Sequence, residues 1–201
     1  MGKRRNDTLA RKQPTREYRK IFWVNTEGQT EQDYLQMDIF KKMETATIKM
    51  PKRVHPGKTN PKQVLQRLKD EIKRGSFRKD DEVWVAIDVD TWSSKDIQEV
   101  IDWANANDRY NVVISNPKIE LFLIMHFEKG NGCTTDATVD KRLSRYLPSY
   151  GKRLTARQFD RNQIETAIGH ARTKRACCIK PIPDPGMTDF YKLVERLLEY
   201  C

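Results

Sequence analysis

The chain has 201 residues, of which 37% are hydrophobic, enough for one domain with a single core. Lys and Arg number 38 against 28 Asp and Glu, and the resulting net charge of +10 favours polyanionic partners such as nucleic acid. The four cysteines form no CxxC pair, which argues against a disulfide framework or a zinc site and favours a reducing cytoplasm. The longest apolar run, Leu121 to Phe127, is far shorter than the ~20 residues that span a bilayer, so we expect no membrane segment.

Residues 1–18 form a basic arm with hardly any apolar side chains, and such a segment cannot fold alone. A phosphate-binding arm and a solubilising tail explain it equally well. The first strand is expected at Ile21–Val24, and the turn Asn25–Gly28 follows it. Open α/β sheets bind their ligands at the carboxyl ends of the strands, which is where Glu27 lies. Gly28 beside it lets the backbone bend sharply or approach a ligand closely.

Two helices and a basic loop are expected before the next strand. A capping box at Thr30–Asp33 begins the first helix. Residues 49–75 then form a basic insert, in which an exposed loop without acidic side chains precedes a second helix. Asn60 is the expected N-cap of that helix, Pro61 its first residue, and Gly75 ends it.

Strands and helices continue to alternate up to about residue 128. A second strand is expected at Glu82–Asp88, a helix after the capping box Ser93–Asp96, and a third strand at Tyr110–Ser115. The helix over 119–127 is apolar almost all round, which is typical of a buried helix, and we interpret His126 within it as a hydrogen-bonded core histidine. This alternation predicts an α/β fold, with a parallel sheet covered by helices on both faces.

Residues 129–201 are expected to form a mostly helical extension packed on the α/β core, which we place at residues 19–128. Within the extension, residues 155–173 have helical spacing. Thr188 is expected to cap a final helix with an apolar face. The chain thus divides into the arm, the core with its basic insert, and the extension.

Acidic side chains follow the first two expected strands. Asp88 and Asp90 lie two residues apart after the second strand, and Glu27 follows what should be a neighbouring strand. Two carboxylates a few ångströms apart repel each other unless a cation joins them. A ligand set of oxygens without His or Cys suits Mg²⁺ or Mn²⁺. Such a metal, placed in a basic protein, could polarise a phosphodiester and generate hydroxide from bound water.

Each acidic motif also has a simpler explanation. Asp88 and Asp90 could merely cap the following turn, and a glutamate such as Glu27 is common near a helix start because of the helix dipole. Their joint occurrence after two apolar strands is what favours a metal site. Two other chemistries that use a DxD motif fit less well. A haloacid-dehalogenase-type phosphatase needs the motif after the first strand and a Thr where this chain has Trp92, and a glycosyltransferase usually needs a longer chain.

Two motifs resemble known families. The pattern Thr26-Glu27-Gly28-x-Thr30-Glu31 after the first strand, with Asp88-x-Asp90 after the second, resembles the Toprim domain, a catalytic module of topoisomerases, primases and nucleases. The pattern Ser115-Asn-Pro-x-x-Glu120-Leu-x-x-x-x-His126-Phe127 more narrowly resembles RloB-like proteins. These are small Toprim-like proteins of prokaryotic defence loci, related to abortive-infection proteins. The resemblance implies a Toprim-like (Rossmann-like) parallel sheet flanked by helices.

The resemblance also implies roles for individual residues. Glu27 would match the Toprim glutamate, which is a general acid/base or a metal ligand, and Asp88 and Asp90 would match the acidic pair that holds Mg²⁺. Glu120 could serve a second metal, and a first-turn carboxylate explains it about equally well. Glu31 could do the same, but its place in the capping box explains it better.

The leading hypothesis is therefore a Mg²⁺-dependent (or Mn²⁺-dependent) nuclease of antiphage defence that acts on DNA or RNA. Its candidate phosphate contacts are Lys20, Lys52, Arg53, Lys58, Lys152 and Arg153. Trp92 is a candidate platform for base stacking. The alternative is a Toprim-like module that binds nucleic acid or a partner without cutting; a nucleotidyl transferase is a weaker third option. A partner defence protein such as an ATPase, and a homodimer, both stay open.

Overall fold

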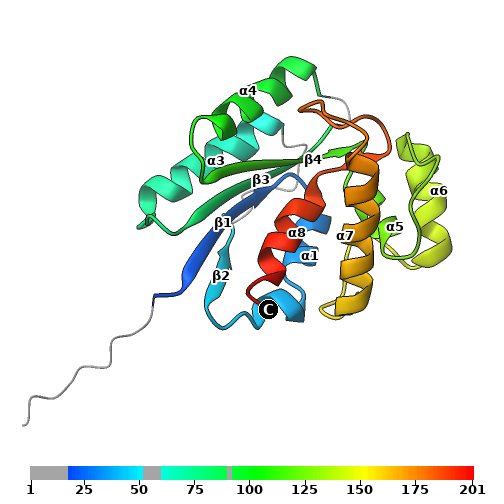
Figure 1. The fold of residues 1–201 in the computed structure, drawn as a ribbon, viewed down its shortest axis with the longest axis horizontal. Coiled ribbons are helices and arrows are strands. Elements are labelled where there is room, and N and C mark those ends of the chain that lie inside the picture. The colour runs from blue at the N-terminus through cyan, green and yellow to red at the C-terminus, as the bar shows by residue number, and fades with distance from the viewer. Residues whose placement is uncertain (1–17, 52–59, 90–91) are drawn as a thin grey trace, which may run out of the picture.

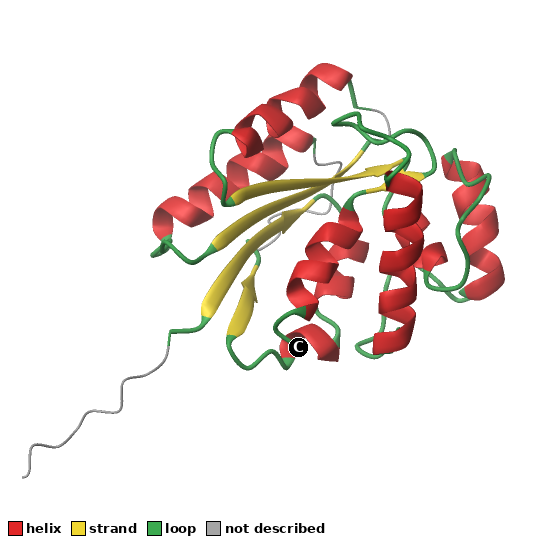
Figure 2. Cartoon of the chain, in the orientation of Figure 1, coloured by secondary structure: helices red, strands yellow, loops and turns green. Residues whose placement is uncertain are grey.

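A five-stranded sheet forms the centre of the molecule (Figures 1 and 2). The computed structural model describes residues 18–51, 60–89 and 92–201. In the order β2-β1-β3-β4-β5, the strands are β2 (Ala46–Lys49), β1 (Lys20–Thr26), β3 (Glu82–Asp88), β4 (Tyr110–Asn116) and β5 (Met187–Thr188). The first four pair in parallel, and β5 pairs antiparallel with β4. This confirms the α/β class and a Rossmann-like arrangement.

Helices cover both faces of the sheet (Figure 1). One face carries α3 (Pro61–Arg74) and α4 (Ser94–Asn105). The helices whose buried residues join the core on the other face are α1 (Gln29–Leu35), α2 (Asp38–Lys41), α5 (Glu120–Met125), α6 (Asp136–Tyr146), α7 (Arg161–Arg175) and α8 (Phe190–Leu198). A parallel sheet needs this double cover, because both of its faces are apolar.

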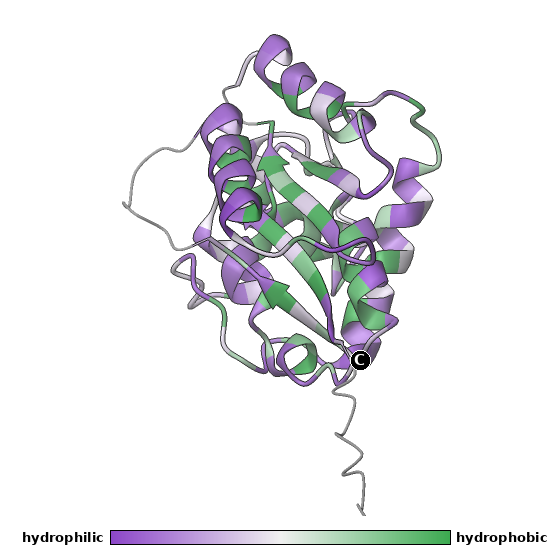
Figure 3. Cartoon of the chain, turned by 90° about the vertical axis from the view of Figure 1, so that its left-hand side faces the viewer, coloured by the Kyte–Doolittle hydropathy of each residue, from purple (hydrophilic) through white to green (hydrophobic). Residues whose placement is uncertain are grey.

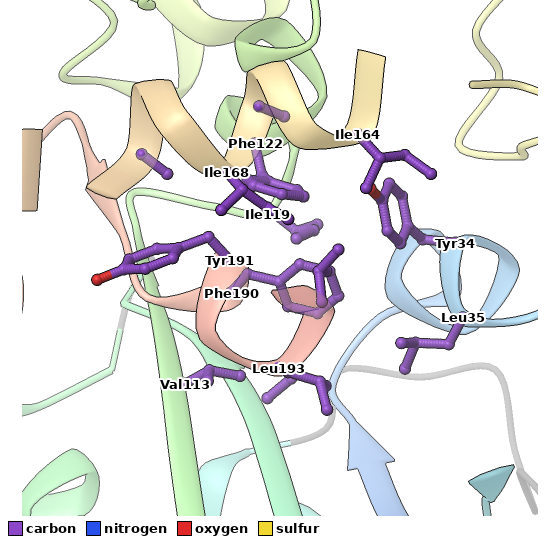
Figure 4. Close-up of a cluster of buried hydrophobic side chains, with 14 of the residues drawn as sticks. Tyr34, Leu35, Val113, Ile119, Phe122, Ile164, Ile168, Phe190, Tyr191 and Leu193 are labelled. Carbon is purple, nitrogen blue, oxygen red and sulfur yellow. The ribbon is translucent and has the colours of Figure 1, made fainter. Parts of the chain in front are cut away.

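The strands divide their side chains between two hydrophobic cores. Along β1, Phe22 and Val24 join the larger core while Trp23, between them, joins the smaller one under α3 and α4. Figure 3 shows hydrophobic residues concentrated in the strands and hydrophilic residues on the outward sides of the helices. In the larger core Tyr34 of α1, Phe122 of α5 and Phe190 of α8 meet (Figure 4), and their ring centroids lie 5.5 to 5.7 Å apart.

His126 is a core residue, as the sequence predicted. Its Nε2 lies 3.0 Å from the Tyr34 hydroxyl and its Nδ1 lies 3.0 Å from the carbonyl oxygen of Phe122. The imidazole also stacks on Phe159, with centroids 3.7 Å apart. Burial lowers the pKa of His126 to about 3, so the ring is neutral at physiological pH. His126 is therefore a structural residue of the core.

Local structure follows the sequence signals at most of the expected boundaries. Asn60 caps α3 by accepting a hydrogen bond from the backbone of Gln63 at 2.8 Å, and Pro61 is the first helical residue. Ser93 caps α4 by accepting from the backbone of Asp96 at 3.2 Å. The strand that contains Asp88 pairs directly with β1, as expected, although it is the third strand along the chain.

Several elements differ from the sequence expectations. The short edge strands β2 and β5 were not predicted, and the first expected helix is divided into α1 and α2. The helix expected from residue 155 begins at Arg161, because Asp160 caps it by accepting from the backbone of Gln163 at 2.8 Å. Thr188 ends β5 and the N-cap of α8 is Asp189, although the Thr188 hydroxyl does accept a hydrogen bond from the backbone of Phe190 at 3.1 Å.

The C-terminal part of the chain is joined closely to the sheet. β5 adds an edge strand beside β4, and α7 and α8 supply much of the larger core. The division at residue 128 stays a prediction, and residues 1–17 of the basic arm lie outside the described residues. None of the helices in the described part of the chain is long and apolar enough to cross a membrane.

Candidate active site

The candidate site lies where β1 and β3 end. These two strands pair directly, so Glu27 and Asp88 come together at one edge of the sheet. The backbone N–H of Asp88 donates to Glu27 Oε2 at 3.3 Å, and Trp92 Nε1 donates to Glu27 Oε1 at 2.9 Å. Glu27 is therefore held by both of its carboxylate oxygens. Trp92 thus orients this glutamate, and its role as a platform for base stacking stays a prediction.

The segment after β4 adds a third side to the site. The backbone N–H of Ile119 lies near the carboxylate of Asp88 and by itself would lower its pKa, but burial and the neighbouring acids outweigh it. Glu120, the first residue of α5, is 5% exposed. Its Oε1 accepts a hydrogen bond from the Tyr150 hydroxyl at 2.9 Å and lies 3.5 Å from the Thr30 hydroxyl. Three successive strand ends thus bring Glu27, Asp88 and Glu120 to one place.

Glu31 contributes a fourth carboxylate. Its Oε1 accepts a hydrogen bond from the backbone of Gly28 at 3.0 Å, so the N-cap of α1 is Gly28 and its N3 residue is Glu31, not Thr30 and Asp33 as the sequence predicted. Its Oε2 is buried and has no hydrogen-bond partner among the described residues. A Cβ at position 28 would collide with that same oxygen. The backbone φ of Gly28 is −106°, which any residue can adopt, so glycine here makes room for the Glu31 carboxylate rather than for a sharp turn.

The crowding of these acids changes their proton affinity. Glu27, Glu31, Asp88 and Glu120 line a single pocket of about 190 Å³, and Asp136 is a fifth acid in its lining. Burial raises the pKa of Glu31 to about 7, and the negative charges of Glu120 and Glu27 add to this effect. Burial, followed by the charges of Glu31, Glu120 and Glu27, raises the pKa of Asp88 well above its usual range. The pocket thus favours species that neutralise negative charge.

Two lysines also line this pocket. Lys118 is ion-paired with Asp140 at 2.8 Å, and Asp136 lies beside it in the lining. Lys152 is exposed and has a left-handed backbone, with φ of 58°. Of the candidate phosphate contacts, Lys152 is the one that the described part of the fold brings to the carboxylates.

Two other candidate phosphate contacts are engaged elsewhere. Lys20 lies at the amino end of β1, the far end of the strand from Glu27, and pairs with Glu82 at 2.6 Å. Arg153 donates from Nε to Asp33 Oδ2 at 2.7 Å. The candidate phosphate contacts Lys52, Arg53 and Lys58 lie outside the described residues, and so does the candidate metal ligand Asp90. Contact of the basic residues with phosphate stays a prediction.

Comparison with known proteins identifies the family. The family model described as RloB-like protein matches residues 22–197. This chain belongs to the RloB-like family. The matched region contains Glu27, Glu31, Asp88 and Glu120. Searches of curated proteins and of solved structures gave no match.

The donor set of this RloB-like chain fits a hard divalent cation. Its ligand atoms are all carboxylate oxygens, which Mg²⁺ and Mn²⁺ prefer, and Glu31 Oε2 is buried without a hydrogen-bond partner among the described residues. Within residues 18–51, 60–89 and 92–201, no three Asp, Glu, His or Cys side chains already have the spacing of a metal site. A cation would therefore have to draw the carboxylates together. Glu27, Glu31, Asp88 and Glu120 are the described residues that could hold it.

Sequence reasoning set aside one contributor to the site and missed another. The resemblance named Glu31 as an acid that could serve a second metal, but a capping role was favoured for it. Tyr150 had no local signal. Its bond to Glu120 joins residues 30 positions apart, and only the packing of the C-terminal part onto α5 reveals it.

Proposed function

We propose that this chain is a Mg²⁺-dependent (or Mn²⁺-dependent) nuclease that hydrolyses phosphodiester bonds in DNA or RNA. The observation that carries the proposal is the crowding of four carboxylates at the ends of β1, β3 and β4, where Glu31 Oε2 is buried without a hydrogen-bond partner among the described residues. Such crowding is unfavourable unless protons or a cation neutralise it. The net charge of +10 supports a polyanionic substrate.

The acidic residues of the pocket take two tasks in this proposal. Asp88, Glu31 and Glu120 would hold the cation, with Asp90 as a further ligand predicted from the sequence. A Mg²⁺ ion bound there would polarise the phosphodiester and lower the pKa of bound water. Glu27, oriented by Trp92 and by the backbone of Asp88, accepts the proton of the attacking water.

Basic groups complete the proposed site. Lys152 at the pocket contacts the phosphate that is to be cut. The proposed biological role, prokaryotic antiphage defence by abortive infection, follows from the resemblance to RloB-like proteins. Its substrate in that role is a nucleic acid of the infected cell or of the phage.

A cleavage assay tests the proposal. Labelled DNA and RNA are incubated with the protein in Mg²⁺, in Mn²⁺ and in EDTA. We expect cleavage that needs the metal and that Asp88→Ala and Glu27→Gln abolish. The matched control is Glu82→Gln, which alters an acid at the opposite end of β3 and should leave cleavage intact. Cleavage in EDTA would contradict the proposal. Binding without cleavage in either metal, retained by Asp88→Ala, would favour the non-catalytic binding module.

A further inference from the structure

A second pocket adjoins the carboxylate pocket. It has a volume of about 310 Å³ and lies between the end of α6 and the segment 147–158. Tyr146, Tyr150, Arg153 and Gln158 are among its lining residues. The volume falls at the lower end of the ~300–1,000 Å³ typical of small-molecule sites. A single flat ring system is a suitable occupant for a pocket of this size.

The segment 150–153 connects the two pockets. The Tyr150 side chain lines the second pocket, while its hydroxyl donates to Glu120 Oε1 at 2.9 Å in the carboxylate pocket. Lys152 lines the carboxylate pocket and the next residue, Arg153, lines the second one. The left-handed backbone of Lys152 turns the chain at this point. A group bound in one pocket therefore lies about one side chain from the other.

The lining of the second pocket is suited to a planar ring. The Tyr146 ring is stacked on Phe127, with centroids 4.6 Å apart and planes inclined by 1°, and its hydroxyl donates to Glu128 Oε2 at 3.0 Å. The ring is thus fixed before any ligand arrives. The Arg153 side chain is 72% exposed and is anchored through Nε to Asp33. Tyrosine rings and arginine guanidinium planes are the groups on which unpaired nucleobases stack.

The polar lining residues fit the edge of a base better than an aliphatic ligand. Gln158 and Thr155 both line the pocket, and Gln158 Oε1 accepts from the Thr155 hydroxyl at 3.2 Å. Amide and hydroxyl groups of this kind form hydrogen bonds with the edges of bases in single-stranded nucleic acid. An arginine in the lining also favours a ligand that carries phosphate.

We propose that this second pocket binds the base of an unpaired nucleotide next to the phosphodiester held at the carboxylates. It follows that the substrate is single-stranded, or has one base turned out of its helix. This inference rests on the proposed nuclease function, and it names the class of substrate for that same site.

Binding in EDTA tests the pocket without any cleavage. The affinity of the wild-type protein for a short fluorescent oligonucleotide is measured by anisotropy, and an abasic site is moved along the strand one position at a time. We expect one position at which loss of the base weakens binding about 5- to 150-fold, the range for one stacked base. The series is made in both ribose and deoxyribose forms. A loss in either series supports the pocket, and a loss in the ribose series alone also identifies RNA as the ligand.

Variants of the lining residues test whether the base binds in the second pocket. Tyr146→Ala and Arg153→Ala should each reduce the difference between intact and abasic strands at that position. Tyr146→Phe keeps the ring and should keep the difference. Arg157→Ala is the matched control, because Arg157 is exposed, pairs through Nε with Asp38 at 2.9 Å and is not a lining residue of this pocket.

The outcomes separate this inference from the proposed function. Equal affinity for every abasic strand, or a difference that survives both Tyr146→Ala and Arg153→Ala, would overturn the base pocket even if metal-dependent cleavage is found. Base-dependent binding in a protein that never cleaves would support the pocket and overturn the nuclease. Duplex that binds as tightly as single strand would also count against the pocket.

Discussion

Acidic side chains at the two ends of β3 have opposite surroundings. At the amino end, Glu82 is ion-paired with Lys20 at 2.6 Å and with Arg196 at 2.8 Å. Burial alone would raise its pKa, but the hydrogen bonds from these two cations lower it. At the carboxyl end, Asp88 faces other acids and its pKa is raised. The fold thus neutralises Glu82 with its own cations, whereas Asp88 is surrounded by other acids.

At the amino end of β3, the carboxylate of Asp81 has a full set of hydrogen-bond donors. This buried carboxylate accepts hydrogen bonds from the backbone of Ile21 and of Arg78, both at 3.0 Å, from Trp23 Nε1 at 3.2 Å, and from the Tyr18 hydroxyl. At the other end, Glu31 Oε2 has no such partner among the described residues. A buried acid with a structural role needs hydrogen-bond partners for its carboxylate oxygens. Because one such oxygen at the carboxyl end has none, we place the functional site there.

The largest expected effect is a difference in cleavage rate between variants at the two ends of β3. Asp88→Ala should lower the rate of metal-dependent cleavage roughly 10³-fold, equivalent to about 4 kcal/mol, because a principal ligand of the cation is lost. Glu82→Gln should change that rate only a few-fold. Single-turnover cleavage by the two variants checks this. Equal losses in both would mean that the two ends do not differ in function.

A second prediction separates the ends by stability. Asp81→Ala leaves the donors of Trp23 and Ile21 buried without an acceptor, so we expect the free energy of unfolding to fall by about 3 kcal/mol. Asp81→Asn keeps one side-chain oxygen and should lose less. Urea unfolding of both variants measures the effect. A loss below about 1 kcal/mol in Asp81→Ala would show that these bonds contribute little.

A third prediction concerns pH, because the folded pKa of Glu31 is about 7 and lies above its usual value of 4.5. The protonated form is favoured in the fold, so this contribution to stability is full below pH ~4.5 and is lost as the pH rises through 7. Glu31→Gln resembles the neutral form. Without metal, it should be more stable than the wild type by about 1–3 kcal/mol at pH 8.

The control for the Glu31 prediction is the same pair of proteins at pH 4.5, where the difference should largely disappear. With Mg²⁺ at pH 8 the order should reverse, because the wild type gains a ligand that the variant binds more weakly. Thermal unfolding at the two pH values measures both. A Glu31→Gln variant that is less stable than the wild type at pH 8 without metal would contradict the raised pKa.

The smallest expected effect concerns the orientation of Glu27. Trp92→Phe removes the donor to Glu27 Oε1 and keeps an aromatic ring, so cleavage should fall about 5-fold, corresponding to one partly exposed hydrogen bond of ~1 kcal/mol. Trp103→Phe is the control, because Trp103 stacks on Tyr110 in the face covered by α4. A loss of base stacking instead would appear as weaker binding of single strands by Trp92→Phe with an unchanged rate of cleavage.

The sequence predicted those features that local patterns encode. Apolar runs located β1, β3 and β4, and caps at Asn60 and Ser93 located α3 and α4. Glu27 and Asp88 were expected at the carboxyl ends of two neighbouring strands, and the pairing of β1 with β3 confirms that these strands are neighbours. Residues whose environment is set within a few positions of the chain were the predictable ones.

The features that were missed depend on distant parts of the chain. β2 is a short edge strand with a half-polar sequence, and it exists because it pairs with β1. β5 needs β4 beside it. A capping role explained Glu31, so the burial of its second carboxylate oxygen was not predicted. Tyr150 contacts Glu120 only through tertiary packing. Local pattern does not encode such long-range contacts.

Thermal unfolding in Mg²⁺ tests most directly whether a cation binds at the carboxyl end of the sheet. Three proteins are titrated at pH 8: the wild type, Asp88→Ala/Asp90→Ala and Glu82→Gln. At metal concentrations about 100 times Kd, we expect the wild type and Glu82→Gln to gain about 2.7 kcal/mol, a rise in Tm of roughly 5–10 °C, while the double variant gains nothing. An equal rise in all three proteins, or no rise in the wild type, would contradict a metal site at these carboxylates.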